Sequence, residues 1–394
     1  MKKLLFLAAC GLLSLPLSAQ QDVKPYNQKT LYETLAKVEK KSDRFNFYLN
    51  MHNSFNAGWD GDKFSNAAFK MDQLRLEAKG NINDWIYYRW RQRLNRHNNG
   101  SGTQDNLSSS IDYAAVGFKV APNFAIFAGK QCASYGGIEF DLNPIEIYQY
   151  SDMIDYLSNF MTGVNFIYDA TPSQQFCFQV LDSRSAKFDE IYPNPGPQYS
   201  SSKASLVYTL NWNGSFADGL VKTRYSASYM SEAREKLSTD KYRNRSLWYY
   251  ALGTEFNLGP VNAFFDWMYS REALDRLGIV SNIVGGQAVS HTKYMSYVWK
   301  INYRVAPKWN LFVKGMIENE GTYKASAGID KGKFRTAYGY LGGIEYYPMK
   351  ENLHFFLTYI GRSYDYTKAA KAFGATDYST NTISCGFIYQ LQMF

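Results

Sequence analysis

Three arginines at alternate positions form the most informative group of side chains in this 394-residue chain. Arg89, Arg91 and Arg93 lie two residues apart, and side chains with that spacing point to the same face of a β-strand. On the lipid side of a membrane-spanning strand, each arginine near the midplane would cost about 2–4 kcal/mol. The row is therefore predicted to face an aqueous interior and to attract anionic solutes; the alternative is a charged face that only solvates the wall. The predicted pore-lining basic residues are Arg75, Lys79, Arg89, Arg91, Arg93, Lys222 and Arg224.

A long connection near residues 132–158 carries charge of a single sign. Between Gln131 and Phe160 the sequence has five acidic residues and neither Lys nor Arg. If this connection folds into a barrel, its carboxylates would face the arginine row across a narrowing, and low-dielectric walls would focus the transverse field. The alternative is an acidic outer loop that binds divalent cations or nothing. The predicted constriction residues are Glu139, Asp141, Glu146, Asp152 and Asp155.

The sequence offers little for catalysis or metal binding. Its four histidines are scattered and lack the spacing of metal ligands. It has neither a Gly-x-Ser-x-Gly elbow nor a phosphate-binding loop. We therefore predict no catalytic residue, no metal site and no cofactor, and the dispersed basic residues argue against a nucleic-acid partner. The histidines are His52, His97, His291 and His354.

The composition narrows the class of protein. The chain is 45% apolar, 20% charged and 17% aromatic, with a formal net charge of +8. Its mean hydropathy of −0.39 excludes a bundle of transmembrane helices, which needs repeated apolar runs of about 20 residues. The apolar content also argues against a disordered chain. The length by itself allows two or three soluble domains or one large all-β domain.

The first nineteen residues have the order of a secretory signal peptide. Lys2 and Lys3 precede an apolar run, and Ala19 offers a small residue at a cleavage site. Lipidation at Cys10 is the disfavoured alternative, because the apolar run continues past that cysteine. We predict export from the cytoplasm with residues 1–19 removed.

Residues 20–42 are predicted to form a separate periplasmic segment. Leu31, Leu35 and Val38 follow the i, i+4, i+7 spacing of a short amphipathic helix. A plain tether is the equally supported alternative.

From residue 43 to 394 the chain alternates apolar and polar residues with period two. In residues 44–55, for example, Phe45, Phe47 and Leu49 share one face. Such alternation predicts β-strands, and about sixteen stretches of this kind follow one another. We therefore predict an all-β fold, a transmembrane antiparallel β-barrel of about sixteen strands.

The connections between these stretches alternate between short and long. Short periplasmic turns and long extracellular loops are typical of an outer-membrane barrel. A soluble β-sandwich or propeller would also show period-two alternation, but it predicts neither this rhythm nor the many aromatic residues near strand ends. The long connections are predicted near residues 56–66, 96–110, 132–158, 182–202, 231–245, 270–291, 319–333 and 363–378.

Three short motifs suggest a family. The run from Lys70 to Gly80, the segment Tyr87-Tyr88-Arg89-Trp90-Arg91 and the segment from Phe127 to Gln131 together resemble the phosphate-selective porin O/P family, in its Bacteroidetes type. The resemblance implies a sixteen-stranded outer-membrane porin, commonly a homotrimer, with its third outer loop folded inward. The chain departs from that family in one respect, because phosphate selectors use a basic constriction whereas the loop near residues 132–158 is acidic.

We therefore predict a porin in the bacterial outer membrane, surrounded by lipid, rather than an enzyme. Its water-filled channel would pass small hydrophilic solutes and ions by passive diffusion, without established phosphate specificity. The alternative is a barrel-anchored adhesion or assembly protein that has a closed lumen and acts through its extracellular loops.

Overall fold

A computed structural model describes residues 43–96, 105–349 and 353–393. The predicted signal peptide (1–19) and the predicted periplasmic segment (20–42) lie outside the described residues, which start with the predicted barrel at residue 43. No helix in the described part is long and apolar enough to cross a membrane.

The described chain is dominated by strands that join in a single sheet. The first nine are β1 (Asn46–Asp60), β2 (Lys63–Asn81), β3 (Ile86–Arg93), β4 (Ile111–Ala121), β5 (Phe124–Cys132), β6 (Phe160–Thr171), β7 (Gln174–Asp182), β8 (Tyr199–Ser201) and β9 (Leu206–Phe216). The remaining eight are β10 (Val221–Lys236), β11 (Tyr242–Leu258), β12 (Val261–Leu274), β13 (Ser290–Ala306), β14 (Trp309–Thr322), β15 (Gly332–Tyr346), β16 (Leu353–Tyr366) and β17 (Tyr378–Gln392).

The sheet closes on itself. β1 pairs antiparallel with both β2 and β17, which removes the two free edges that an open sheet would have. The three-residue β8 and the longer β9 both pair with β10, so they are two pieces of one barrel strand. The result is a closed antiparallel barrel of sixteen strands, and the predicted fold class is confirmed.

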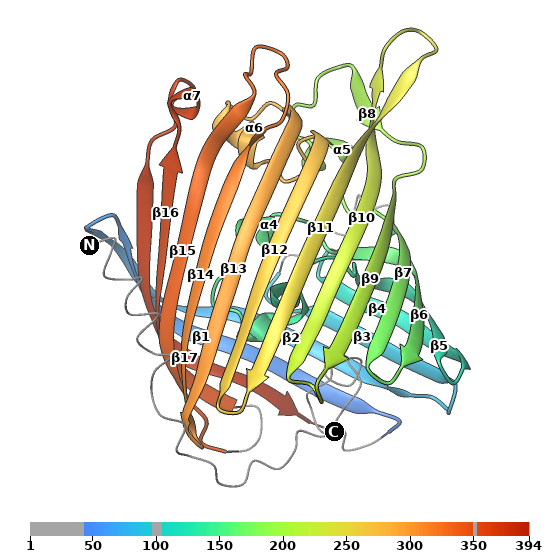
Figure 1. Ribbon diagram of the computed structural model, residues 1–394, viewed down its shortest axis with the longest axis vertical. Coiled ribbons are helices and arrows are strands. Elements are labelled where there is room, and N and C mark those ends of the chain that lie inside the picture. The colour runs from blue at the N-terminus through green and yellow to red at the C-terminus, as the bar shows by residue number, and fades with distance from the viewer. Residues whose placement is uncertain (1–42, 97–104, 350–352, 394) are drawn as a thin grey trace.

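The two ends of the barrel differ. Tight turns join the strands at one end, and long loops rise at the other (Figure 1). Four of the described loops contain short helical turns, and the loop between β5 and β6 contains three of them. The helical turns are α3 (Ile138–Asp141), the 3-10 turn η2 (Pro144–Glu146), α4 (Asp152–Asp155), α5 (Phe188–Ile191), α6 (Ile279–Ile283) and α7 (Lys368–Lys371).

Two predicted long connections are wrong. Most of residues 231–245 continue β10 and β11, and only residues 237–241 join these strands. Residues 56–66 continue β1 and β2 as a hairpin with a connection of only Gly61 and Asp62. Gly61 has a φ of +59°, a conformation in which glycine is favoured because it lacks a Cβ. The polar residues that suggested a loop instead lie on an extended and exposed pair of strands.

Polar side chains fill the interior, and apolar side chains cover the outside. In β14, Leu311, Val313 and Ile317 are exposed, whereas Lys314 and Glu318, at positions of the opposite parity, are buried. A soluble sandwich would show the reverse, with its apolar face inside. The alternation of apolar and polar residues along each strand therefore places apolar side chains against lipid and polar side chains in the interior of the barrel.

Apolar side chains also pack inside the barrel, where the loops enter it. Met153 and Leu157 of the connection between β5 and β6 belong to one buried cluster with Met268 on β12 and Met316 on β14. Figure 1 shows α4 between the front wall and the strands behind it. This cluster fixes the loop against one wall and so determines which residues face the remaining space.

Candidate functional site

Four arginines from β2 and β3 lie on the interior face of the barrel. Arg75 and Arg93 are register partners, and Arg91 opposes Glu77 in the same ladder. Arg75 and Arg91 are only 4% and 6% exposed. The strand pairing therefore turns a row of three arginines along the chain into a two-strand patch.

A β-bulge brings a carboxylate to this patch. Arg91 opposes Tyr113 in the β3–β4 ladder, whereas the next residue, Gln92, opposes Ile111. Asp112 is the extra residue of the bulge, and a bulge redirects side chains relative to regular alternation. Without the bulge, Asp112 and Tyr113 would point to opposite faces of the sheet.

Asp112 is the shared counterion of three arginines. Its carboxylate lies 3.3 Å from Arg75 Nη1, 3.1 Å from Arg91 Nε and 2.9 Å from Arg93 Nε. The aspartate has no exposed surface. Charge-assisted contacts of this kind are strong, and a buried carboxylate without them would be costly.

Arg89 has a different partner. Its Nε lies 2.8 Å from the Glu77 carboxylate. The ring of Tyr113 lies 4.0 Å from Arg89 Cζ and 4.8 Å from Arg91 Cζ, so its face covers both guanidinium groups. Four arginines share the two carboxylates of Glu77 and Asp112, which leaves the patch with a surplus of positive charge.

The loop between β5 and β6 enters the barrel and binds the opposite wall through its backbone. The amides of Ile138 and Glu139, at the start of α3, donate hydrogen bonds of 2.8 and 2.7 Å to the Asp266 carboxylate on β12. The Gly136 amide donates to Ser226 Oγ on β10 at 3.1 Å. This loop, residues 133–159, is called the constriction loop below.

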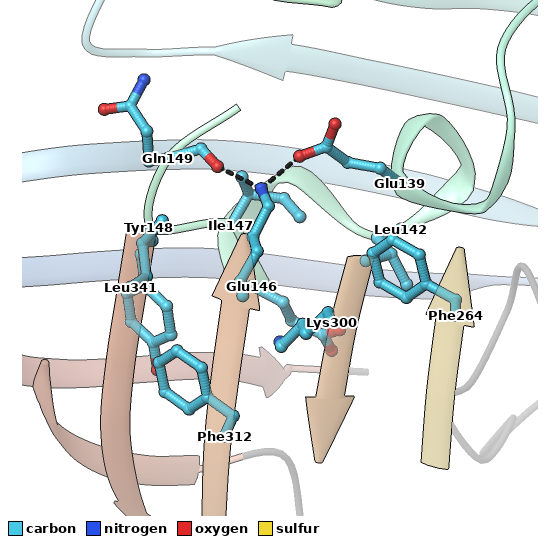
Figure 2. Close-up of a pocket in the computed structure, with 11 residues that line it drawn as sticks. Glu139, Leu142, Glu146, Ile147, Tyr148, Gln149, Phe264, Lys300, Phe312 and Leu341 are labelled. Atoms are coloured by element: carbon cyan, nitrogen blue, oxygen red, sulfur yellow. Dashed lines mark hydrogen bonds and ion pairs between the residues drawn. The ribbon is translucent and has the colours of Figure 1, made fainter. Parts of the chain in front are cut away.

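The acidic residues of the constriction loop also bind that wall. Glu139 pairs with Lys314 on β14, which also donates to the Gln149 carbonyl of the loop (Figure 2). Asp141 lies 3.3 Å from Arg224 on β10. These two ion pairs hold α3 at two separate strands.

Asp152, in α4, makes the densest set of contacts. Its carboxylate pairs with both Arg335 on β15 and Arg362 on β16. Its backbone amide donates to Glu318 Oε1 at 2.6 Å, and Glu318 Oε2 accepts from Arg362 Nη1 at 3.1 Å. Arg335 also pairs with Glu320 on β14, 2.7 Å away, so two arginines hold three carboxylates in this cluster.

Glu146 lines a small pocket beneath the constriction loop. Lys300 and Phe312 belong to the same pocket, and the Lys300 amine lies 4.9 Å from the Phe312 ring (Figure 2). Glu146 itself is exposed. This pocket lies on the β12–β15 wall and does not include the arginines of β3.

Asp155 is exposed at the end of α4. Desolvation inside the barrel and the neighbouring Asp152 raise the pKa of its carboxyl above the ordinary value. Asp155 therefore takes up its proton at a higher pH than an ordinary aspartate does.

The electrostatic arrangement therefore differs from the expected one. The described ion pairs of the loop acids run to β10 and β14–β16, and those of the arginines run to Glu77 and Asp112. Tyr150 of the loop lies near Arg75 and Arg91. Glu139, Asp141 and Asp152 have described ion pairs with the far wall, whereas Glu146 and Asp155 have none.

Comparison with known proteins places this barrel in a family. A sequence profile described as phosphate-selective porin O and P matches residues 45–391. The chain belongs to the phosphate-selective porin O and P family. No curated protein sequence matches the chain. Family and fold together support an outer-membrane channel.

Solved porin structures share the fold at low sequence identity. The outer-membrane channel DcaP of Acinetobacter baumannii is 16% identical with a TM-score of 0.59, over 90% of this chain and 99% of that one. OmpT of Vibrio cholerae is 12% identical with a TM-score of 0.53, over 90% and 100%. OmpF of Salmonella typhi, solved in complex with daunomycin, is 13% identical with a TM-score of 0.58, over 90% and 99%. Such identities show the fold alone.

The porin brings some of the predicted basic residues together and separates others. Arg75, Arg89, Arg91 and Arg93 form one patch. Lys79 is the register partner of Arg89 and so adjoins this patch, and its Nζ lies 5.0 Å from the Tyr48 ring. The two basic residues on β10 lie elsewhere: Arg224 binds Asp141 of the loop and Asn213 of β9, and Lys222 opposes Glu255 of β11.

Several contact residues of this porin were missed in the sequence analysis. Asp112 had one signal in the sequence, because it shares the parity of the apolar Ala114, Val116 and Phe118, and a carboxylate on that lipid-facing side indicates a bulge. The loop-binding residues have no local signal, because their partners lie far away in the chain. They are Asp266, Lys314, Arg335 and Arg362.

Proposed function

We propose that this porin passes small hydrophilic solutes by passive diffusion and prefers anions to cations. Wall cations pair with three of the five acids of the constriction loop, whereas the arginine patch keeps a surplus of positive charge. Ions in a narrow, low-dielectric passage respond strongly to such uncompensated charge. No chemical step is part of this proposal.

The observation that carries the proposal is the sharing of Asp112 by three arginines. One carboxylate cannot neutralise three guanidinium groups. Among the described ion pairs of the patch, the other carboxylate is that of Glu77, which pairs with Arg89. Phosphate specificity is not part of the proposal, because the constriction loop has neither Lys nor Arg and presents Tyr150, not a further cation, to Arg75.

The test replaces Arg89, Arg91 and Arg93 together by glutamine and measures reversal potentials in planar bilayers under a KCl gradient. We expect the chloride-to-potassium permeability ratio to fall more than tenfold, because each unit charge changes it by about threefold at moderate salt. The matched control replaces the same residues by lysine, which keeps the charge and should keep the preference. An unchanged ratio in the glutamine variant would exclude the arginine patch as the source of selectivity.

Liposome swelling with sugars of graded size tests diffusion itself. The wild-type protein should admit the small sugars and exclude the larger ones. If no sugar enters, the lumen is closed and the adhesion or assembly function becomes the better explanation.

A homotrimer is the proposed assembly. OmpT of Vibrio cholerae has been solved in a trimer form. Here β3 has eight residues and β5 and β7 have nine each, which is at or below the roughly 9–11 residues that cross a bilayer. A neighbouring subunit would shield this short wall from lipid. Light scattering of the detergent-solubilised protein should give three times the chain mass after subtraction of detergent; a single chain mass would exclude the trimer.

A further inference from the structure

Three basic residues form a lateral row on the outer surface of the barrel, near its long-loop end. Arg271 on β12 pairs directly with Lys293 on β13. Lys293 pairs with Gly321 on β14, which pairs in turn with Lys333 on β15. The row thus follows the strand register across four adjacent strands. At Gly321 the backbone of Gly332 and Lys333 occupies the place of a side chain, so no side chain stands between the two lysines.

The charges of this row are not matched by described carboxylates. In the described part of the chain, none of its three cations has an ion pair with a carboxylate. Arg271 instead lies 4.1 Å from the ring of Tyr323. Of the acids near the row in sequence, Glu272 and Glu320 are buried on the interior face, at 0% and 2% exposure, whereas Asp330 is exposed and has no described ion pair with the row.

Such an arrangement is unfavourable without a further partner. Like charges directly opposite each other on neighbouring strands are destabilising. Strands are spaced about 4.8 Å apart, so Lys293 and Lys333 lie within about 10 Å and their flexible side chains can converge on one group. An anion that bridges the row would remove the repulsion.

The residues beneath the row place it at the level of lipid headgroups. Two residues closer to the midplane, the outward positions of β12 and β13 are Tyr269 and Met295, and the next pair is Trp267 and Tyr297. Ile317 on β14 continues this apolar level and is 45% exposed. Aromatic side chains mark the edge of the hydrocarbon region, and basic residues directly beyond that edge meet the headgroups.

We infer that Arg271, Lys293 and Lys333 bind a phosphorylated headgroup of a lipid in the outer leaflet. Guanidinium groups bind phosphate oxygens bidentately, and the two lysine ammonium groups add point charges on the neighbouring strands. The tyrosine ring over Arg271 orients its guanidinium group. This site lies on the outside of the barrel, so it is independent of the channel and of its selectivity.

The experiment uses the full porin in a non-ionic detergent and a diphosphorylated, glucosamine-based lipid as the probe. Binding is measured by native mass spectrometry over a lipid titration. Parallel titrations use the same lipid after removal of its phosphates, a zwitterionic phosphatidylcholine, and inorganic phosphate. We expect the phosphorylated lipid to bind, and the three other probes to bind at least tenfold more weakly.

The test variant is R271Q with K293Q and K333Q. Each surface cation strengthens binding to anionic lipid about fivefold, so we expect a loss of about 100-fold. The matched control, K119Q with K187Q and K308Q, removes three exposed cations elsewhere and should bind as the wild type does. If the triple variant does not fold, the single variant K333Q should still lose about fivefold.

Three results would overturn the inference. The triple variant could bind the phosphorylated lipid as tightly as the wild type. The lipid without phosphates could bind equally well, which would assign the affinity to acyl chains. Inorganic phosphate could bind the row as tightly as the lipid, which would make it a site for free anions.

Discussion

Replacing Asp112 by asparagine tests the electrostatic logic of the channel most directly. The substitution keeps the side-chain shape and removes the carboxylate that Arg75, Arg91 and Arg93 share. Four arginines would then retain only Glu77 as a paired acid, so the surplus charge of the patch rises by one unit. An anion near the patch should be attracted more strongly, and a cation should be repelled more strongly.

The size of the effect follows from Coulomb's law. One unit charge about 7 Å from a passing ion changes its energy by about 0.6 kcal/mol in water. Salt at 0.1 M, with a Debye length of about 10 Å, reduces this by about half. The effect has opposite signs for chloride and potassium, so the difference is about 0.6 kcal/mol, or about threefold in the permeability ratio.

The assay is the reversal potential of Asp112→Asn in a planar bilayer, with Asp377→Asn as the control. Asp377 lies in the exposed loop between β16 and β17 and pairs with Lys371, 2.6 Å away, so its loss should leave the ratio unchanged. The reasoning is refuted if Asp112→Asn migrates as a folded barrel on an unheated gel and yet keeps the wild-type permeability ratio. A shift toward potassium would refute it equally.

Three further predictions concern the loop and the barrel wall. Lys314→Met leaves the buried Glu139 without its ion pair, a change that typically costs 3–5 kcal/mol, so single-channel recordings should show larger and noisier currents; a steady wild-type current would contradict this. The raised pKa of Asp155 predicts that this carboxyl is neutralised at a higher pH than an ordinary aspartate, so the preference for chloride should rise as the pH falls; Asp155→Asn should show that preference already at pH 7 and lose this part of the pH dependence. Gly117→Ala places a methyl group against the Tyr87 ring, which an ideal Cβ would approach to 1.9 Å, so thermal unfolding should show a free energy of unfolding lower by about 1–3 kcal/mol. Gly259→Ala is the comparison: it lies in an open turn with a φ of +69°, so it tests backbone strain without a clash.

The barrel itself could be read from the sequence because its cause is local. A strand in a membrane barrel must present apolar groups to lipid and polar groups to water at every second position. Phe45, Phe47 and Leu49 show this, and so do the three arginines of β3. Their shared face needs only the geometry of one strand, without knowledge of any partner.

The ends of the strands were harder to predict from the sequence. The polar residues near positions 56–66 suggested a loop, yet β1 and β2 continue through them to Gly61 and Asp62. A hairpin that leaves the membrane is exposed on both faces, so it no longer needs an apolar side. Composition then cannot separate strand from loop.

The sequence by itself determined the alternation, the strand number and the single sign of charge in the constriction loop. Only the tertiary structure decided which charges meet. Glu139 and Lys314 are 175 positions apart, and Asp112 joins the arginines because a bulge shifts the β3–β4 register by one residue. Alternation is a property of each strand in its solvent, whereas ion pairs depend on register and loop path, which are set only when the whole sheet closes.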